Sequence, residues 1–219
     1  MVRQRLAAAA TAAGRSVDCI TLLAVSKAQP AASIRALAAQ GVRHFGESYL
    51  HEALAKMGSL GDLPLVWHFI GRVQANKTRA LAGAFDWIHG VDRLKIAERL
   101  SAQRPFHAAP LNVCLQVNLA AESAKGGIST TQLPALAAAV ARLPQLQLRG
   151  LMCLPPAEND PARQRGWFAA LRRELTSLNA SGAALDTLSM GMSGDFEAAV
   201  QEGATIVRIG TALFGPRDP

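Results

Sequence analysis

The sequence has 219 residues, of which 50% are hydrophobic and 18% are charged, and its formal net charge is +7. This length allows one large domain or two small ones, and the apolar content is sufficient for a large core. No apolar run reaches the length of a membrane-spanning helix, and the dispersed basic residues lack the interleaved aromatic side chains that stack on bases. We therefore expect contact with neither membranes nor nucleic acids.

The first residues combine Arg3 and Arg5 with an alanine-rich run over 6–13, which superficially resembles a secretory signal. Alanine is a weak hydrophobe but the strongest helix former, and Gly14 suits the position that follows a helix. We therefore predict a short surface helix that leads into the first strand, and a cytoplasmic protein.

The first strong apolar run extends from Ile20 to Val25 and is followed by Ser26 and Lys27. Both of its faces are apolar, which is typical of a strand in a parallel sheet covered on both sides. Lys27 lies in phase with the apolar side chains of Leu23 and Val25, at the carboxyl end of this strand. Burial disfavours the charged form of an amine, and a neutral amine can attack a carbonyl. The alternative is a strand-end lysine whose ammonium group reaches water.

Seven further strand-like segments follow the first and alternate with helical segments. The predicted strands are 20–27, 42–47, 65–71, 85–89, 111–118, 146–153, 187–190 and 205–209, and the helices between them include 34–40, 49–57, 93–102, 133–142, 163–178 and 195–202. Such alternation indicates a parallel sheet built by right-handed crossovers, and eight units is the count of the TIM barrel. We therefore predict an α/β fold, a single (β/α)8 barrel with an extra N-terminal helix, as one domain over 1–219.

The loops after the seventh and eighth strands, 190–195 and 208–212, are rich in glycine. In a TIM barrel these two loops often hold a phosphate, because glycine lets backbone amides approach an anion and a following helix presents its first N–H groups. The hydroxyl groups of Ser193 and Thr211 could also donate. The alternative is ordinary turns, with Ser193 as a helix cap, and Asp195 in the first helical turn would compete for the same helix dipole. Barrel closure places Lys27 next to the eighth strand, and this combination favours a phosphate site.

Arg208 lies inside the apolar eighth strand, between Val207 and Ile209. A buried guanidinium needs an acceptor. That acceptor could be a core carboxylate or carbonyl, or it could be the ring nitrogen of a bound pyridine, which an arginine would keep unprotonated.

Cysteines and histidines show no spacing that specifies a metal site. We expect core packing for the cysteines, whose odd number indicates a reducing compartment, and core or rim positions for three of the histidines. The residues are Cys19, Cys114, Cys153, His44, His68 and His89.

Six ordered motifs together resemble the pyridoxal phosphate (PLP) homeostasis proteins, the YggS/PROSC family of single-barrel PLP binders related to the barrel domain of alanine racemase. The motifs are 22–27, 44–47, 67–77, 149–152, 189–193 and 207–211, and they span the chain nearly end to end. The resemblance implies that Lys27 carries PLP as a Schiff base and that Arg208 faces the pyridine nitrogen. It implies a phosphate cradle made by Ser193, Gly194, Gly210 and Thr211, with Met192 in the same site.

Two positions depart from the family pattern. Ser48 replaces an asparagine, and Gln29 replaces a second lysine found in many members, which removes a second-lysine route for cofactor transfer there. Lys125 matches a family lysine and is a candidate for a secondary site, the alternative being a flexible-loop lysine.

The choice between enzyme and carrier depends on a second acid/base group. A PLP-dependent racemase needs such groups on both faces of its substrate adduct, and alanine racemase takes one, a tyrosine, from another domain and subunit. The single tyrosine here is Tyr49, and an arginine at the pyridine nitrogen weakens the electron sink. We therefore expect a non-enzymatic, monomeric PLP carrier or regulator that contacts apo PLP enzymes transiently. The alternatives are a stand-alone amino-acid racemase and a PLP-free, aldolase-like barrel.

Overall fold

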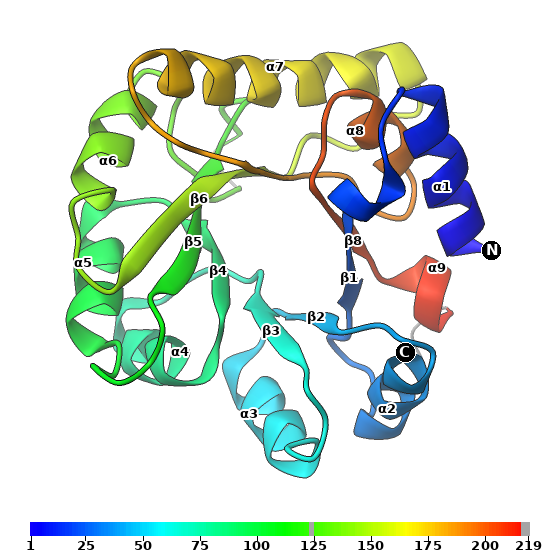
Figure 1. The fold of residues 1–219 in the computed structure, drawn as a ribbon. Coiled ribbons are helices and arrows are strands. Elements are labelled where there is room, and N and C mark those ends of the chain that lie inside the picture. The colour runs from blue at the N-terminus through cyan, green and yellow to red at the C-terminus, as the bar shows by residue number, and fades with distance from the viewer. Residues whose placement is uncertain (123–124, 216–219) are drawn as a thin grey trace.

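A closed barrel of parallel strands forms the centre of the molecule (Figure 1). The computed structural model describes residues 1–122 and 125–215. Within them eight strands follow one another in chain order around the barrel, and β1 pairs with β8 to close it. The strands are β1 (Thr21–Val25), β2 (His44–Glu47), β3 (Val66–Phe69), β4 (Trp87–Val91), β5 (Leu111–Val117), β6 (Leu146–Cys153), β7 (Thr187–Ser189) and β8 (Ile206–Ile209). The predicted (β/α)8 barrel is confirmed.

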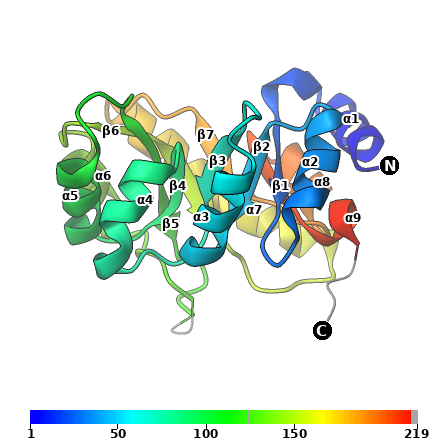
Figure 2. The same ribbon diagram turned by 90° about the horizontal axis from the view of Figure 1, so that it is seen from below.

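Helices surround the strands, and Figure 2 shows α2, α3 and α4 on the near side of the barrel. The α-helices are α1 (Val2–Ala12), α2 (Ala31–Ala39), α3 (Leu50–Ser59), α4 (Thr78–Ala84), α5 (Leu94–Gln103), α6 (Leu133–Val140), α7 (Pro161–Ala180), α8 (Phe196–Gln201) and α9 (Thr211–Phe214). Two 3₁₀ helices, η1 (Val17–Cys19) and η2 (Ala75–Lys77), lie in the connections.

The predicted N-terminal helix is confirmed as α1, which packs beside α8 (Figure 1). The Arg5 guanidinium lies 2.6 Å from Glu197 and 4.7 Å from the ring centre of Phe196, and Arg15 donates a hydrogen bond to the carbonyl of Val200 at 2.9 Å. Gly14 follows the helix with φ +64°, a conformation that glycine adopts without steric cost.

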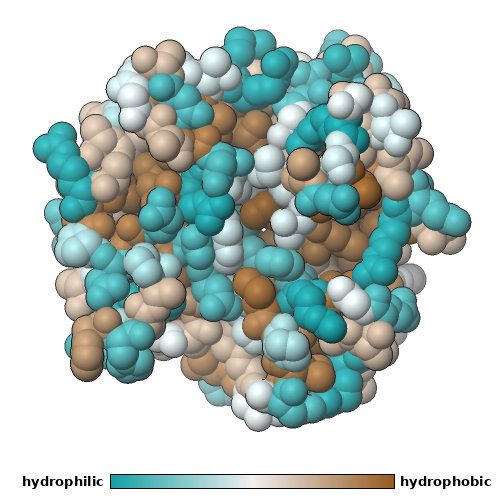
Figure 3. Space-filling model, in the orientation of Figure 1, coloured by the Kyte–Doolittle hydropathy of each residue, from teal (hydrophilic) through white to brown (hydrophobic). Residues whose placement is uncertain are grey.

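The apolar core fills the layer between strands and helices, as expected for apolar side chains that leave water. On the face seen in Figure 3, hydrophobic residues lie mostly in hollows between hydrophilic ones. The barrel also buries polar side chains, including His68, His89 and Arg208. Gly150 is required where β6 meets β7, because a Cβ there would lie 1.9 Å from the carbonyl oxygen of Thr187.

Several element bounds differ from the expectations. The fourth strand runs from Trp87 to Val91 rather than from Phe85 to His89, and beside its start the Asp86 carboxylate accepts the Trp67 amide at 2.8 Å. Lys27 lies in a turn, two residues after β1 ends. Cys19 is exposed in η1, so core packing is wrong for this cysteine and correct for Cys114 and Cys153.

Candidate functional site

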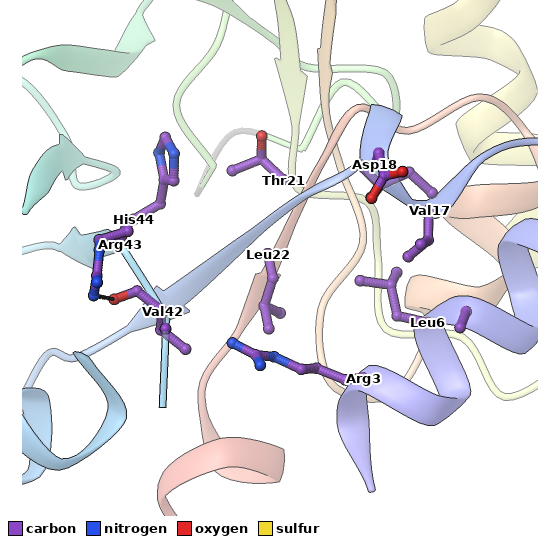
Figure 4. A pocket seen from close by; sticks show the side chains of 12 residues that line it. Arg3, Leu6, Val17, Asp18, Thr21, Leu22, Val42, Arg43 and His44 are labelled. Atoms are coloured by element: carbon purple, nitrogen blue, oxygen red, sulfur yellow. Dashed lines mark hydrogen bonds between the residues drawn. The ribbon is translucent and has the colours of Figure 1, made fainter. Parts of the chain in front are cut away.

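Two of the cavities lie at opposite ends of β1. The larger, of about 520 Å³, lies at the amino-terminal ends of β1 and β2, where Arg3 of α1 extends toward Leu22 and Val42 (Figure 4). None of the predicted site residues lines it. Function in TIM barrels resides at the carboxyl ends of the strands. The smaller cavity, which lies there, is therefore the better candidate.

That smaller cavity has a volume of about 320 Å³ and brings all seven predicted site residues together. They come from the turn after β1, from β8, and from the loops after β7 and β8. The predicted residues are Lys27, Met192, Ser193, Gly194, Arg208, Gly210 and Thr211. Val25, Ser48, Ile70 and Leu154 complete the lining, and of these only Ser48 was singled out in the sequence.

The turn that carries Lys27 is fixed on both sides of the lysine. Ser26 is fully buried, and its hydroxyl donates to Glu47 Oε1 at 2.6 Å. The Ala28 amide donates to Glu52 Oε1 at 2.6 Å. Ala28 has φ +58°, a left-handed conformation that costs a non-glycine residue about 1 kcal/mol. The Glu52 bond offsets this strain and holds the turn toward the cavity.

Lys56 connects these two carboxylates. Its ammonium group donates to Glu47 Oε1 at 2.8 Å, to Glu52 Oε1 at 2.6 Å and to the Ser26 carbonyl at 2.6 Å. These three bonds use all three N–H donors of the ammonium group. Burial raises the pKa of Glu47, while the bonds from Lys56 and Ser26 lower it. Glu47 is thus a supporting residue behind the lysine turn.

Sequence reasoning missed Lys56. Its spacing of four residues from Glu52 indicates a helical ion pair, but such pairs are common on exposed helix surfaces. The informative contact is with Glu47 on β2, and nothing in the local sequence predicts it.

The loops after β7 and β8 are joined to each other and to β8. The Ala212 amide donates to Ser193 Oγ at 3.4 Å, and the Arg208 amide donates to the Gly191 carbonyl at 2.9 Å. Gly191 has φ +90°, and a Cβ there would lie 2.6 Å from the Cβ of Ala199. The Asp195 carboxylate accepts the Met192 amide at 2.5 Å, which fixes the loop before α8.

Arg208 is 3% exposed and is held by uncharged acceptors. One terminal nitrogen donates to the carbonyl and hydroxyl oxygens of Ser189 at 2.5 and 2.9 Å, and the other donates to the Cys153 carbonyl at 2.8 Å. Burial lowers its pKa. The carbonyl alternative considered for Arg208 is therefore observed, and the same side chain also lines the cavity.

The three strand histidines occupy core and rim positions as expected. His68 and His89 are fully buried, and His44 is partly exposed at the start of β2. Burial lowers the pKa of all three side chains, that of His89 to about 3. Across residues 1–122 and 125–215, no cluster of His, Cys, Asp and Glu is arranged to hold a metal ion.

Other motif residues lie outside the candidate cavity. Gln74 and Lys77 line a neighbouring hollow of about 330 Å³, which also contains Tyr49 and shares Ser48 with the candidate cavity. Lys125 donates to Glu122 and to the Pro155 carbonyl, both at 3.0 Å. Residues 123 and 124 of its motif lie outside the described residues.

Comparison with known proteins places the chain in a family. The alanine racemase N-terminal domain model matches residues 2–218. The chain is 58% identical over 217 residues to the pyridoxal phosphate homeostasis protein of Pseudomonas aeruginosa (99% of this chain, 93% of that protein). It is 49% identical over 220 residues to the protein of that name from Escherichia coli strain K12 (99% and 94%).

A solved structure gives the same result. PipY of Synechococcus elongatus PCC7942, solved with PLP bound, superposes with a TM-score of 0.86 at 40% identity, covering 98% of this chain and 100% of that one. The similarity extends over the whole described barrel rather than over one motif. The chain therefore belongs to the alanine racemase N-terminal domain family and, within it, to the pyridoxal phosphate homeostasis proteins.

Proposed function

We propose that this chain binds PLP in the cavity at the carboxyl end of the barrel and acts in PLP homeostasis as a carrier or regulator. The observation that carries the proposal is the convergence of an amine, a buried guanidinium and two hydroxyl-bearing glycine loops on one cavity of about 320 Å³. The relatives named for this role, and PipY with PLP bound, support it.

The residues present fit the chemical groups of PLP. Lys27 would hold the aldehyde carbon as a Schiff base, and Arg208 would face the pyridine nitrogen. The phosphate would lie against Ser193, Gly194, Gly210 and Thr211, with Met192 beside it. A Cβ added at Gly194 would meet no atom within 4 Å, so this residue leaves open space in the lining. Bound PLP supplies a reactive aldehyde and an electron sink.

A carrier role is favoured over the racemase alternative by the side chains around the cavity. Among the lining residues in the described part of the chain, the ionisable ones are Lys27 and Arg208. An arginine does not exchange protons near neutral pH, so it cannot serve as the second acid/base group. Tyr49 is 60% exposed and lines the neighbouring hollow. These observations support retention of PLP rather than turnover of amino acids.

The remaining features of the proposal concern partners and location. We propose a single PLP-binding domain over 1–219 that works as a cytoplasmic monomer, contacts apo PLP enzymes transiently and binds no nucleic acid. Over the described ranges, no helix combines the length and apolar character that a bilayer span requires.

The test is to locate the modified lysine. The chain is incubated with PLP, reduced with borohydride, digested and analysed by mass spectrometry, with a Lys27→Arg variant and a matched Lys77→Arg control. We expect the reduced adduct on Lys27, its loss in Lys27→Arg and its retention in the control. An adduct on Lys125 or Lys56 alone would refute the proposed site, and enzymatic α-proton exchange from added amino acids would favour the racemase.

A further inference from the structure

A chain of hydrogen bonds crosses the barrel and ends at Arg208. His44 Nδ1 lies 2.9 Å from His68 Nε2, and His68 Nδ1 lies 2.9 Å from His89 Nε2. His89 Nδ1 lies 2.8 Å from Ser189 Oγ, which accepts from Arg208 at 2.9 Å. The bond from β4 to β7 joins strands that are not neighbours, so this chain runs through the inside of the barrel.

Which atom donates in each of these hydrogen bonds follows from the positions that the protons can occupy. A guanidinium can only donate, so Arg208 makes Ser189 Oγ an acceptor. The Ser189 proton then points to His89 Nδ1, its other partner in the chain. A neutral His89 must therefore carry its proton on Nε2 and donate to His68 Nδ1. The same reasoning puts the proton of His68 on Nε2, directed at His44 Nδ1.

The opposite direction leaves one proton without an acceptor. Ser189 Oγ would then accept from both Arg208 and His89, and its own hydroxyl proton would have no acceptor among its bonded neighbours. Leaving a buried donor unsatisfied costs about 1–3 kcal/mol. The direction from Ser189 toward His44 is therefore preferred.

With this direction of donation, the acceptor atom of each hydrogen bond faces the buried guanidinium of Arg208. In the described part of the chain, Arg208 is bonded to two carbonyls and one hydroxyl, and it forms no ion pair with a carboxylate. Hydrogen bonds in series polarise one another, and here each acceptor faces the Arg208 end. Trp87 stacks on His68 with ring centres 5.3 Å apart, and Asp86 is the acid that acts on His44. The dipoles of the neutral histidines thus face the charge of Arg208, and Asp195 adds a Coulombic attraction without a direct ion pair.

We propose that Ser189, His89, His68 and His44 are positioning residues that fix the guanidinium of Arg208 through one ordered chain of neutral Nε2–H imidazoles. The proposal rests on the proposed function where it assigns Arg208 to the pyridine nitrogen. The direction of the hydrogen bonds from Ser189 to His44 is a property of the protein without PLP.

The first test is ¹⁵N NMR of the histidine rings in the full-length chain without PLP, between pH 5.5 and 8. The sequence has five histidines, and exposed His51 and His107 provide internal references. We expect the rings of His44, His68 and His89 to give the ¹⁵N pattern of the neutral Nε2–H tautomer at pH 8, and those of His68 and His89 to keep it down to pH 5.5. An Nδ1–H tautomer in any of the three, or protonation of His68 or His89 within this pH range, would overturn the proposal.

The second test measures PLP affinity in His89 variants. His89→Leu removes the acceptor that holds Ser189, whereas His89→Asn keeps an acceptor near the Nδ1 position. We expect PLP binding to weaken about tenfold in His89→Leu, to recover substantially in His89→Asn and to be unchanged in the exposed control His107→Leu. If His89→Leu fails to fold, His89→Asn is compared with His89→Ala instead.

The outcomes separate the two proposals. Equal affinity of wild type and His89→Leu would refute the positioning role, even if the tautomers are as expected. Absence of PLP binding in the wild type, together with the expected NMR signals, would refute the proposed function and leave the ordered chain in place.

Discussion

Removal of the Lys56 ammonium group should destabilise the protein strongly. In Lys56→Met the fully buried Glu47 carboxylate keeps the Ser26 hydroxyl and loses its cation, while its Oε2 atom has no hydrogen-bond partner among the residues that the structure describes. Breaking a buried pair by removing one partner costs about 3–5 kcal/mol. This is a large share of the roughly 5–15 kcal/mol by which domains are stable. At about 2–4 °C per kcal/mol for a chain of this size, Tm should fall by roughly 6–20 °C.

The assay is urea and thermal unfolding, with an exposed ion pair as the matched control. Arg35 and Asp62 are bonded at 2.6 Å with side chains 47% and 58% exposed, so Arg35→Met should leave the free energy of unfolding nearly unchanged. Glu47→Gln added to Lys56→Met should recover part of the loss, because no unpaired charge is then buried. A Lys56→Met variant within 1 kcal/mol of wild type would refute the reasoning.

The loss of stability in Lys56→Met should also depend on pH. Without the bonds from Lys56, the pKa of Glu47 should rise further above its ordinary value. A carboxyl whose folded-state pKa is raised stabilises the fold below its unfolded pKa, and this stability is lost as pH rises through the folded pKa. The deficit of Lys56→Met relative to wild type should therefore be smallest near pH 4 and grow toward neutral pH.

Two further predictions follow from buried groups. Burial lowers the pKa of His68 well below 6.5 and that of His89 to about 3, so both imidazoles bind protons on unfolding. The contribution of these two histidines to the free energy of unfolding should be fully present above about pH 6.5. Below that pH it should fall by up to about 1.4 kcal/mol per pH unit for each histidine. A urea midpoint that does not change between pH 7 and pH 5 would contradict this. Burial also raises the pKa of Cys114 and Cys153 to about 12, whereas Cys19 is exposed. A thiol reagent should modify one cysteine quickly in the native chain and all three in urea, and rapid native labelling of three would show that the core opens.

The barrel and the lining of its cavity were predictable because each depends on local order in the sequence. Alternating strands and helices put every strand's carboxyl end on one face, so loops distant in sequence must meet there. Lys27 and the two glycine loops follow from this rule. The family resemblance assigned their roles, and those roles stay predictions.

The supporting contacts were not predictable, because they join residues that only the closed barrel brings together. Lys56 reaches Glu47 from a helix, and His89 reaches Ser189 across 100 positions of sequence. Single residues of these types occur in any core or on any surface, and their spacing carries no periodic signal. The bond between the Asp86 carboxylate and the Trp67 amide, which joins two neighbouring strands, is of the same kind.

The ammonium group of Lys56, whose three N–H donors are all bonded, has a consequence for which lysine reacts with aldehydes. An amine attacks a carbonyl through a lone pair, and a buried ammonium ion that donates to three acceptors has none to offer. Aldehyde reagents should therefore spare Lys56, even though its bonds reach the backbone of the residue next to Lys27. The fold thus protects Lys56 from the chemistry that we propose for Lys27.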